Sequence, residues 1–125
     1  MTGPPKPRQG EVWQVTLDPT LGEEMAKTRP CVVVSGDTIG RLALRVVVPI
    51  TDWKDRYSAY PWMTRLDPML ESGLHKTSAA DAFQIRSVSL ARFLNPIGKL
   101  PDERVDRISR SVALSVRTPR TNLRP

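Results

Sequence analysis

Residues Lys27 to Ser35, with the sequence KTRPCVVVS, decide the fold because a polar segment runs straight into a β-branched one. The run from Cys31 to Ser35 is typical of a buried strand. Arg29 directly abuts this strand, so we expect its backbone to be held rigid. A fixed arginine presents a planar fork of N–H donors that suits a phosphate group. The stretch therefore predicts a core strand with a candidate phosphate ligand where the strand starts.

Further short strands are expected on both sides of this one. In the segment EVWQVT, Val12 and Gln14 fall on one face, and Trp13 and Val15 fall on the other. Gly and Pro residues mark a long loop and a turn between the strands. Besides Cys31–Ser35, the pattern predicts strands at 11–16, 42–50 and 59–66, one or two more within 77–88 with Ile85 and Val88 as core candidates, a loop at 17–27 and a turn at 35–40.

The C-terminal region changes to a helical period. Val105, Ile108, Val112 and Val116 form one apolar stripe on a helix that ends near Val116. Pro101 suits the first turn, and the acidic residues after it complement the helix dipole. Five or six short strands followed by one helix predict a mainly β fold, a small, partly open β-barrel with a C-terminal α-helix.

The chain's length of 125 residues fits one domain. We assign this domain to residues 10–116. Pro-rich residues 1–9 are expected to form a flexible N-terminal arm, and residues 117–125, with three arginines and two prolines, a basic flexible tail.

The net charge of +6 favours contact with a phosphate backbone. No apolar run approaches the roughly 20 residues of a membrane span, so we expect no membrane association. A single cysteine, Cys31, allows no internal disulfide and suits a reducing cytoplasm. His75 and Cys31 are isolated in the sequence, so we predict no metal site and no cofactor. We interpret His75 as a solvated loop residue.

A second polar side chain stands at the end of a predicted strand. The segment Pro49-Ile50-Thr51 places a hydroxyl there, as Arg29 places a guanidinium at the start of its own strand. Both groups would suit one phosphate, although composition alone does not show that they meet. The loop before Arg29 also carries a carboxylate pair, Glu23 and Glu24.

An ordered set of short motifs resembles the MazF/PemK toxin family over residues 9–116. Each motif alone is weak, but the set with its spacings is specific. The motifs are Gly10-Glu11-Val12-Trp13, Asp18-Pro19-Thr20, Gly22, Lys27-Thr28-Arg29-Pro30, Val48-Pro49-Ile50-Thr51, Tyr60-Pro61, Gly73-Leu74, Gln84-Ile85-Arg86 and Pro96-Ile97-Gly98-Lys99-Leu100.

The resemblance implies an SH3-like barrel, a homodimer, and a toxin that cleaves single-stranded RNA at short sequences. It also implies a cognate antitoxin that blocks the groove at the dimer interface. The implied catalytic residues are Arg29, Thr51 and the loop acid Glu24; those assigned to RNA binding are Lys27, Thr28, Phe83, Gln84 and Arg86.

One position departs from the family pattern. Many members have an aspartate directly before the Q-I-R segment, where this chain has Phe83. Asp81 lies two residues earlier, on the same face of a regular strand. We favour a core position for Phe83, with a platform on which an RNA base stacks as the alternative.

RNA cleavage without a metal uses the 2′-hydroxyl as its nucleophile. Arg29 suits the charge that develops on the phosphorane, and Thr51 adds a hydrogen bond to the same oxygens. An arginine side chain is a poor base near neutral pH, so we assign the base to Glu24 and leave Arg29 open as the acid.

Two other functions fit parts of the pattern. A gyrase-poisoning toxin of the CcdB type shares this barrel and cuts nothing, but it does not need the Arg29 and Thr51 motifs. A non-catalytic RNA-binding module is the second alternative, and Phe83 in place of the aspartate keeps it open.

Overall fold

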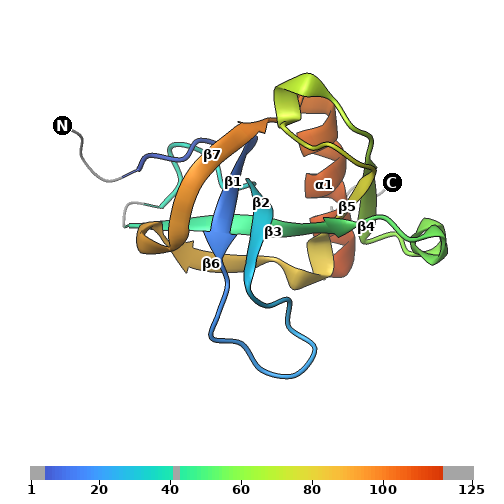
Figure 1. The fold of residues 1–125 in the computed structure, drawn as a ribbon, viewed down its shortest axis with the longest axis horizontal. Helices are drawn as coiled ribbons and strands as arrows, with labels where there is room; N and C mark the ends of the chain where they lie inside the picture. The colour runs from blue at the N-terminus through green and yellow to red at the C-terminus, as the bar shows by residue number, and fades with distance from the viewer. Residues whose placement is uncertain (1–4, 41–42, 117–125) are drawn as a thin grey trace, which may run out of the picture.

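The computed structural model of the protein describes residues 5–40 and 43–116. Within these ranges, seven strands form one antiparallel sheet that ends in a helix (Figure 1). The strands are β1 (Glu11–Thr16), β2 (Thr28–Val33), β3 (Leu44–Asp52), β4 (Met63–Leu66), β5 (Ser78–Asp81), β6 (Arg86–Ser89) and β7 (Phe93–Lys99), the helix is α1 (Asp102–Ser115), and the short 3-10 helices are η1 (Asp55–Ala59), η2 (Leu70–Ser72), η3 (Ala82–Gln84) and η4 (Leu90–Arg92).

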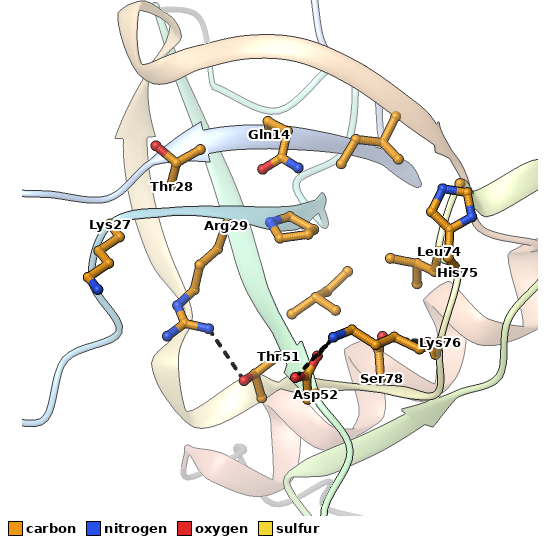
Figure 2. Close-up of a pocket in the computed structure, with 14 residues that line it drawn as sticks. Gln14, Lys27, Thr28, Arg29, Thr51, Asp52, Leu74, His75, Lys76 and Ser78 are labelled. Carbon is orange, nitrogen blue, oxygen red and sulfur yellow. Dashed lines mark hydrogen bonds and ion pairs between the residues drawn. The ribbon is translucent and has the colours of Figure 1, made fainter.

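The sheet runs in the order β4-β5-β3-β2-β1-β7, and β6 pairs with the remaining length of β3. Strand β3 holds the fold together because residues 44–47 pair with β6 and residues 50–52 pair with β5. Its other edge pairs with β2, and this pairing brings Arg29 and Thr51 together (Figure 2). Among the described strands, β4 and β7 remain at opposite ends of the path. The predicted mainly β, partly open barrel is therefore confirmed.

Alternating side chains fill two apolar cores, one on each face of the central strands. Val12 belongs to the first core, and its neighbours Trp13 and Val15 belong to the second, as their alternation predicts. Helix α1 covers the first core with Val105 and Ile108, both buried. The helical stripe ends earlier than predicted, since Val116 follows the helix and is 56% exposed. No described helix is long and apolar enough to cross a membrane.

Two points of the strand prediction need correction, the missed strand β7 and the end of β3. Strand β7 was not predicted, because Pro96 and Gly98 interrupt its pattern. The one or two strands predicted within 77–88 are the two strands β5 and β6, which η3 separates. Strand β3 continues past Pro49 to Asp52, and Pro49 lies where β3 exchanges β6 for β5, so its missing N–H falls at a break in the ladder.

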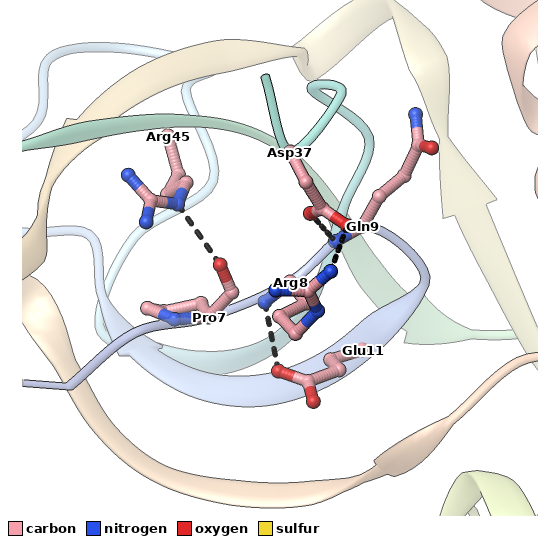
Figure 3. Close-up of polar contacts among 6 residues, drawn as sticks. All are labelled: Pro7, Arg8, Gln9, Glu11, Asp37 and Arg45. Atoms are coloured by element: carbon pink, nitrogen blue, oxygen red, sulfur yellow. Dashed lines mark hydrogen bonds and ion pairs between the residues drawn. The ribbon is translucent and has the colours of Figure 1, made fainter. Parts of the chain in front are cut away.

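The described part of the N-terminal segment is bound to the barrel (Figure 3). Pro7 is fully buried, and its carbonyl accepts a hydrogen bond from Nε of Arg45 at 2.9 Å. Asp37 accepts from the backbone N–H of Gln9 at 2.7 Å and pairs with the guanidinium of Arg8 at 3.0 Å. These contacts differ from the flexible arm predicted over residues 1–9.

The remaining terminal predictions lie outside the described residues. They are the first four residues of the arm and the basic tail at 117–125.

Candidate active site

The register of two strands places Arg29 opposite Thr51. Strands β2 and β3 pair Cys31 with Pro49, so two residues further along each strand Arg29 faces Thr51. Both side chains lie on the face that carries Cys31 of the second core. Nη1 of Arg29 donates a hydrogen bond to Oγ1 of Thr51 at 3.4 Å. The two groups named from the sequence therefore form one site.

The guanidinium of Arg29 is fixed at two atoms. Its Nε donates to the carbonyl of Ala26 at 3.2 Å, and its Nη1 donates to Thr51. An arginine carries five N–H donors, so these two bonds leave three. In the described part of the chain, Nη2 makes no hydrogen bond, so a phosphate can be bound there by an arginine whose position is already set.

Thr51 is oriented by the chemistry of its partner. A guanidinium only donates hydrogen bonds, so Oγ1 of Thr51 must accept from Arg29. The threonine hydroxyl proton is then directed elsewhere and is available for an anionic oxygen. The pair therefore offers donors of two kinds from neighbouring strands, one charged and one neutral.

An open cavity of about 540 Å³ lies over this pair (Figure 2). Lys27, Thr28 and Gln14 line it on the side of β1 and β2, so two of the residues assigned to RNA binding share the cavity with Arg29. Lys27 has a positive φ of 67°, and its carbonyl accepts from the N–H of Leu17 at 2.8 Å. The left-handed turn at Lys27 closes the loop and directs the chain into β2.

The sequence did not single out the polar cavity residues Asp52, His75, Lys76 and Ser78 as site residues. His75 is exposed on the wall across from Arg29, and Lys76 pairs with Asp52 at 3.3 Å (Figure 2). Being the only histidine was the one signal that pointed to His75. Its segment approaches β7 closely, since a β-carbon at Gly73 or Gly98 would clash with backbone across this contact.

Glu24 lies apart from this cavity. It lines a second open cavity of about 470 Å³ with Phe83, Gln84 and Arg86. Its carboxylate accepts a hydrogen bond from the backbone N–H of Leu21 at 2.7 Å, within its own loop. In this structure Glu24 therefore organises the loop, and it is not among the groups that line the Arg29 cavity.

Gln84 and Arg86 hold the loop that precedes β2. The carboxamide of Gln84 accepts from the N–H of Met25 at 3.1 Å and donates to the carbonyl of Glu23 at 3.0 Å. Arg86 donates to the carbonyl of Leu17 at 3.1 Å. These bonds tie η3 and β6 to both ends of the loop, so the two side chains position residues 17–27 relative to the site.

Phe83 is exposed, and the core position predicted for it is wrong. Its side chain is 70% exposed because η3 turns the chain out of the sheet after Asp81. The carboxylate of Asp81 accepts from the N–H of Phe83 at 3.0 Å and caps this turn. Burial raises the pKa of Asp81 above its ordinary value, while bonds from the N–H groups of Phe83 and Gln84 oppose the rise.

The single cysteine does not supply a nucleophile. Burial raises the pKa of the Cys31 thiol to about 12, and the nearby guanidinium groups of Arg86 and Arg29 only partly oppose this. The thiol is fully buried in the second core. Among the described residues, no three His, Cys, Asp or Glu side chains gather as a metal site would require.

These features define a small, partly open β-barrel protein with a paired arginine and threonine beside an open cavity. The family model for PemK-like, MazF-like toxins of type II toxin-antitoxin systems matches residues 8–116. The chain belongs to this family.

Named relatives agree with that membership, and solved structures agree with the fold. The chain is 36% identical to Endoribonuclease MazF9 of Mycobacterium tuberculosis, over 86% of this chain and 93% of the relative. It is 32% identical to Endoribonuclease PemK of Escherichia coli, over 66% and 60%. The fold is similar to the crystal structure of MazF from Deinococcus radiodurans, with a TM-score of 0.72, 21% identity, and 86% and 94% of the two chains covered. A mycobacterial endoribonuclease solved in complex with its cognate antitoxin gives a TM-score of 0.71 at 17% identity, with 92% and 99% covered.

Proposed function

We propose that this protein is the toxin component of a toxin-antitoxin system and a sequence-specific endoribonuclease that cleaves single-stranded RNA without a metal. The observation that carries the proposal is the contact between Arg29 and Thr51 beside an open cavity. Family membership and the 36% identity to an endoribonuclease support it. The net charge of +6 favours a polyanionic substrate.

The proposed reaction is transesterification followed by release of two RNA ends. The 2′-oxygen attacks the adjacent phosphorus, and the bond from phosphorus to the 5′-oxygen breaks. The 2′-hydroxyl proton goes to a base, and the leaving 5′-oxygen takes up a proton. The products are a 2′,3′-cyclic phosphate and a 5′-hydroxyl, and DNA is not cut because it lacks the 2′-hydroxyl.

Arg29 and Thr51 stabilise the phosphorane in this scheme. Fixed donors aimed at developing charge are effective because they need no reorganisation when the charge appears. The two bonds that hold Arg29 meet that requirement, and they leave Nη2 of Arg29 and the Thr51 hydroxyl to donate to the phosphoryl oxygens.

Glu24 is assigned the base and Arg29 the acid, with His75 as the competing proton carrier. For Glu24 to act as the base, the loop must move so that the Glu24 carboxylate leaves the N–H of Leu21 and approaches the substrate. His75 already lines the cavity with Arg29. Comparing Glu24→Gln with His75→Gln distinguishes them, because only replacement of the true proton carrier removes one limb from the pH profile of single-turnover cleavage.

The proposal includes its partners and location. Two copies of the chain form the working toxin, a cognate antitoxin protein covers the RNA groove, and both act in the cytoplasm. The location agrees with a single buried cysteine and no described disulfide.

Single-turnover cleavage of a short RNA in EDTA tests the chemistry. We expect wild-type protein to cut, Arg29→Ala to lose nearly all activity, and Arg29→Lys to recover little, since an ammonium lacks the planar fork. Thr51→Ala should lose roughly 2–4 kcal/mol of transition-state stabilisation. Arg110→Ala, which removes an exposed arginine on α1, is the matched control.

The opposite results identify other functions. Activity lost in EDTA and restored by magnesium would refute the metal-free chemistry. Cleavage by Arg29→Ala at the wild-type rate would remove this site from the reaction. A folded wild-type protein that binds RNA without cutting it would be an RNA-binding module, and one that neither binds nor cuts RNA would favour a gyrase poison of the CcdB type.

A further inference from the structure

Five of the chain's seven aromatic residues lie in one continuous row on the surface. We call them the aromatic row. Successive ring centroids are 5.8, 6.0, 4.8 and 6.1 Å apart along the row Trp53, Tyr57, Tyr60, Trp62 and Phe83.

The aromatic row is separate from the two cores. The other two aromatic residues, Trp13 and Phe93, pack edge to face within the second core. None of the five rings in the row is buried, and Phe83 is 70% exposed. Large rings that could fill a core are instead held at the surface, where their faces can meet a ligand.

The row begins next to the candidate active site. Strand β3 ends at Asp52, so Trp53 follows Thr51 by only two residues. At its other end, Phe83 lines the second cavity with Glu24 and Arg86. A strand of nucleic acid with its phosphate at Thr51 would therefore have the row directly beside it.

Cations accompany the rings. The guanidinium of Arg56 lies 5.3 Å from the ring centre of Tyr57, and that of Arg65 lies 5.5 Å from Trp53. Lys54 adds a third positive charge, against one negative charge from Asp55, over residues 53–65. A row of rings with cations beside two of them matches the bases and phosphates of a single strand better than it matches an apolar protein surface.

The geometry of one pair matches base stacking. The rings of Tyr60 and Trp62 are 10° from parallel with centroids 4.8 Å apart, the arrangement of one base on the next. The ring of Phe83 is tilted by 48° from Trp62 and presents its exposed side to solvent.

We propose that the aromatic row is a stacking platform for bases of single-stranded RNA beyond the cleaved step. The proposal rests on the proposed ribonuclease function and extends its substrate site away from the scissile phosphate. Stacking accepts every base, because each has a π face. The platform therefore lengthens the bound RNA without adding to the sequence that is read.

Tryptophan fluorescence gives a direct readout, since two of the three tryptophans are in the row and Trp13 is in the core. The probe is a mixed-sequence 2′-O-methyl RNA 20-mer, which has no free 2′-hydroxyl and cannot be cut. We expect it to quench wild-type fluorescence and to quench Arg110→Ala, a variant of an exposed arginine on α1, to the same extent. We expect a 5-mer that spans only the cleaved step to quench less.

Variants locate the contact. Trp62→Ala and Phe83→Ala should each bind the 20-mer roughly tenfold more weakly, and Trp62→Phe should restore most of the affinity because it keeps a ring. Ile39→Ala removes an exposed apolar side chain, 72% exposed, from the turn before β3 and should bind as wild type. Circular dichroism checks that each variant is folded. If Trp62→Ala does not fold, Phe83→Ala still tests the platform.

The outcomes separate this proposal from the ribonuclease assignment. Wild-type affinity for the 20-mer in folded Phe83→Ala and Trp62→Ala overturns the platform even if RNA is cut. Such a result would indicate that the row binds a protein partner instead of RNA. Quenching that depends on the row in a protein that does not cut RNA supports the platform and refutes only the ribonuclease function.

Discussion

A positive φ at Lys27 couples local strain to the candidate active site. Left-handed backbone costs a non-glycine residue about 1 kcal/mol, and Lys27 adopts a φ of 67°. The turn brings the carbonyl of Lys27 to the N–H of Leu17 and sets the start of β2 at Thr28, directly before Arg29. A lysine in this position keeps a positive charge at the cavity in spite of the backbone cost.

Lys27→Gly separates the effect of the backbone strain at this position from the effect of its positive charge. Glycine relieves the strain, so we expect the free energy of unfolding to stay equal or rise by up to about 1 kcal/mol. The lost charge should reduce the slope of log affinity against log salt for single-stranded RNA by about 0.7. Lys99→Ala, from a different cavity, is the control. An unchanged salt slope would mean that Lys27 does not contact phosphate.

Asp81 gives the stability a dependence on pH. Burial raises its pKa in the folded state, so folding favours the protonated carboxyl. Its contribution to stability is fully present below the unfolded pKa of about 3.9 and is lost as pH rises through the folded pKa.

Asp81→Asn removes this titration and keeps an oxygen that can accept from the N–H of Phe83. The variant should therefore gain stability relative to wild type as pH rises from 4 to 7. Urea unfolding at several pH values measures this difference. Asp106→Asn changes an exposed aspartate and should show no such trend. A difference that is constant with pH would contradict the role of burial at Asp81.

The loop of residues 17–27 is held by side chains from distant segments. Arg86 and Arg92 bind carbonyls at its start, and Gln84 binds two backbone groups near its end. The loop leads into Arg29 and carries Glu24, so its position determines how both groups meet a substrate. Three side chains from η3, β6 and η4 thus act on the site without lining the Arg29 cavity.

Gln84→Ala should loosen the loop. Two hydrogen bonds are lost, each worth about 1 kcal/mol, so the loop should open at least tenfold more often. Cleavage after Glu23 and Glu24 by a glutamate-specific protease under native conditions measures this opening. Asn95→Ala removes an exposed amide from β7 and is the control. Equal proteolysis of both variants would show that Gln84 does not hold the loop.

Sequence patterns predicted elements with regular periods and failed where pairing decides the outcome. Strand β1 matches its predicted bounds, and α1 lies within its predicted range, because alternation and the 3.6-residue stripe are local signals. Strand β7 contains Pro96, so it forms because β1 offers a partner rather than because of its own pattern.

In the candidate site, too, local patterns identified the residues but did not predict the long-range contacts between them. Arg29 and Thr51 were identified as rigid side chains, but their contact depends on the β2–β3 register, which no local pattern specifies. Phe83 was misplaced because η3 reverses the face that a regular strand would give it. The position of His75 depends on how its segment packs against β7, which is again a long-range contact.

The size of the whole molecule bears on its assembly. A chain of 14.0 kDa has a large surface for its core, and several large apolar side chains remain exposed, among them Leu94 at 56% and Leu114 at 69%. A two-fold dimer would cover part of this surface with one self-complementary interface. It would also place two copies of the Arg29 cavity in one particle.

We therefore expect light scattering at micromolar concentration to give a mass of about 28 kDa, twice that of the 14.0 kDa chain. If both chains contribute to the RNA groove, cleavage per chain should fall when dilution separates them, and added Arg29→Ala protein should not restore it to the wild-type level. If the interface only covers apolar surface and the two chains share no groove, the cleavage rate per chain should instead stay constant on dilution. A 14.0 kDa particle that cleaves RNA at the full rate would show that one barrel, with its own Arg29 and Thr51, is sufficient.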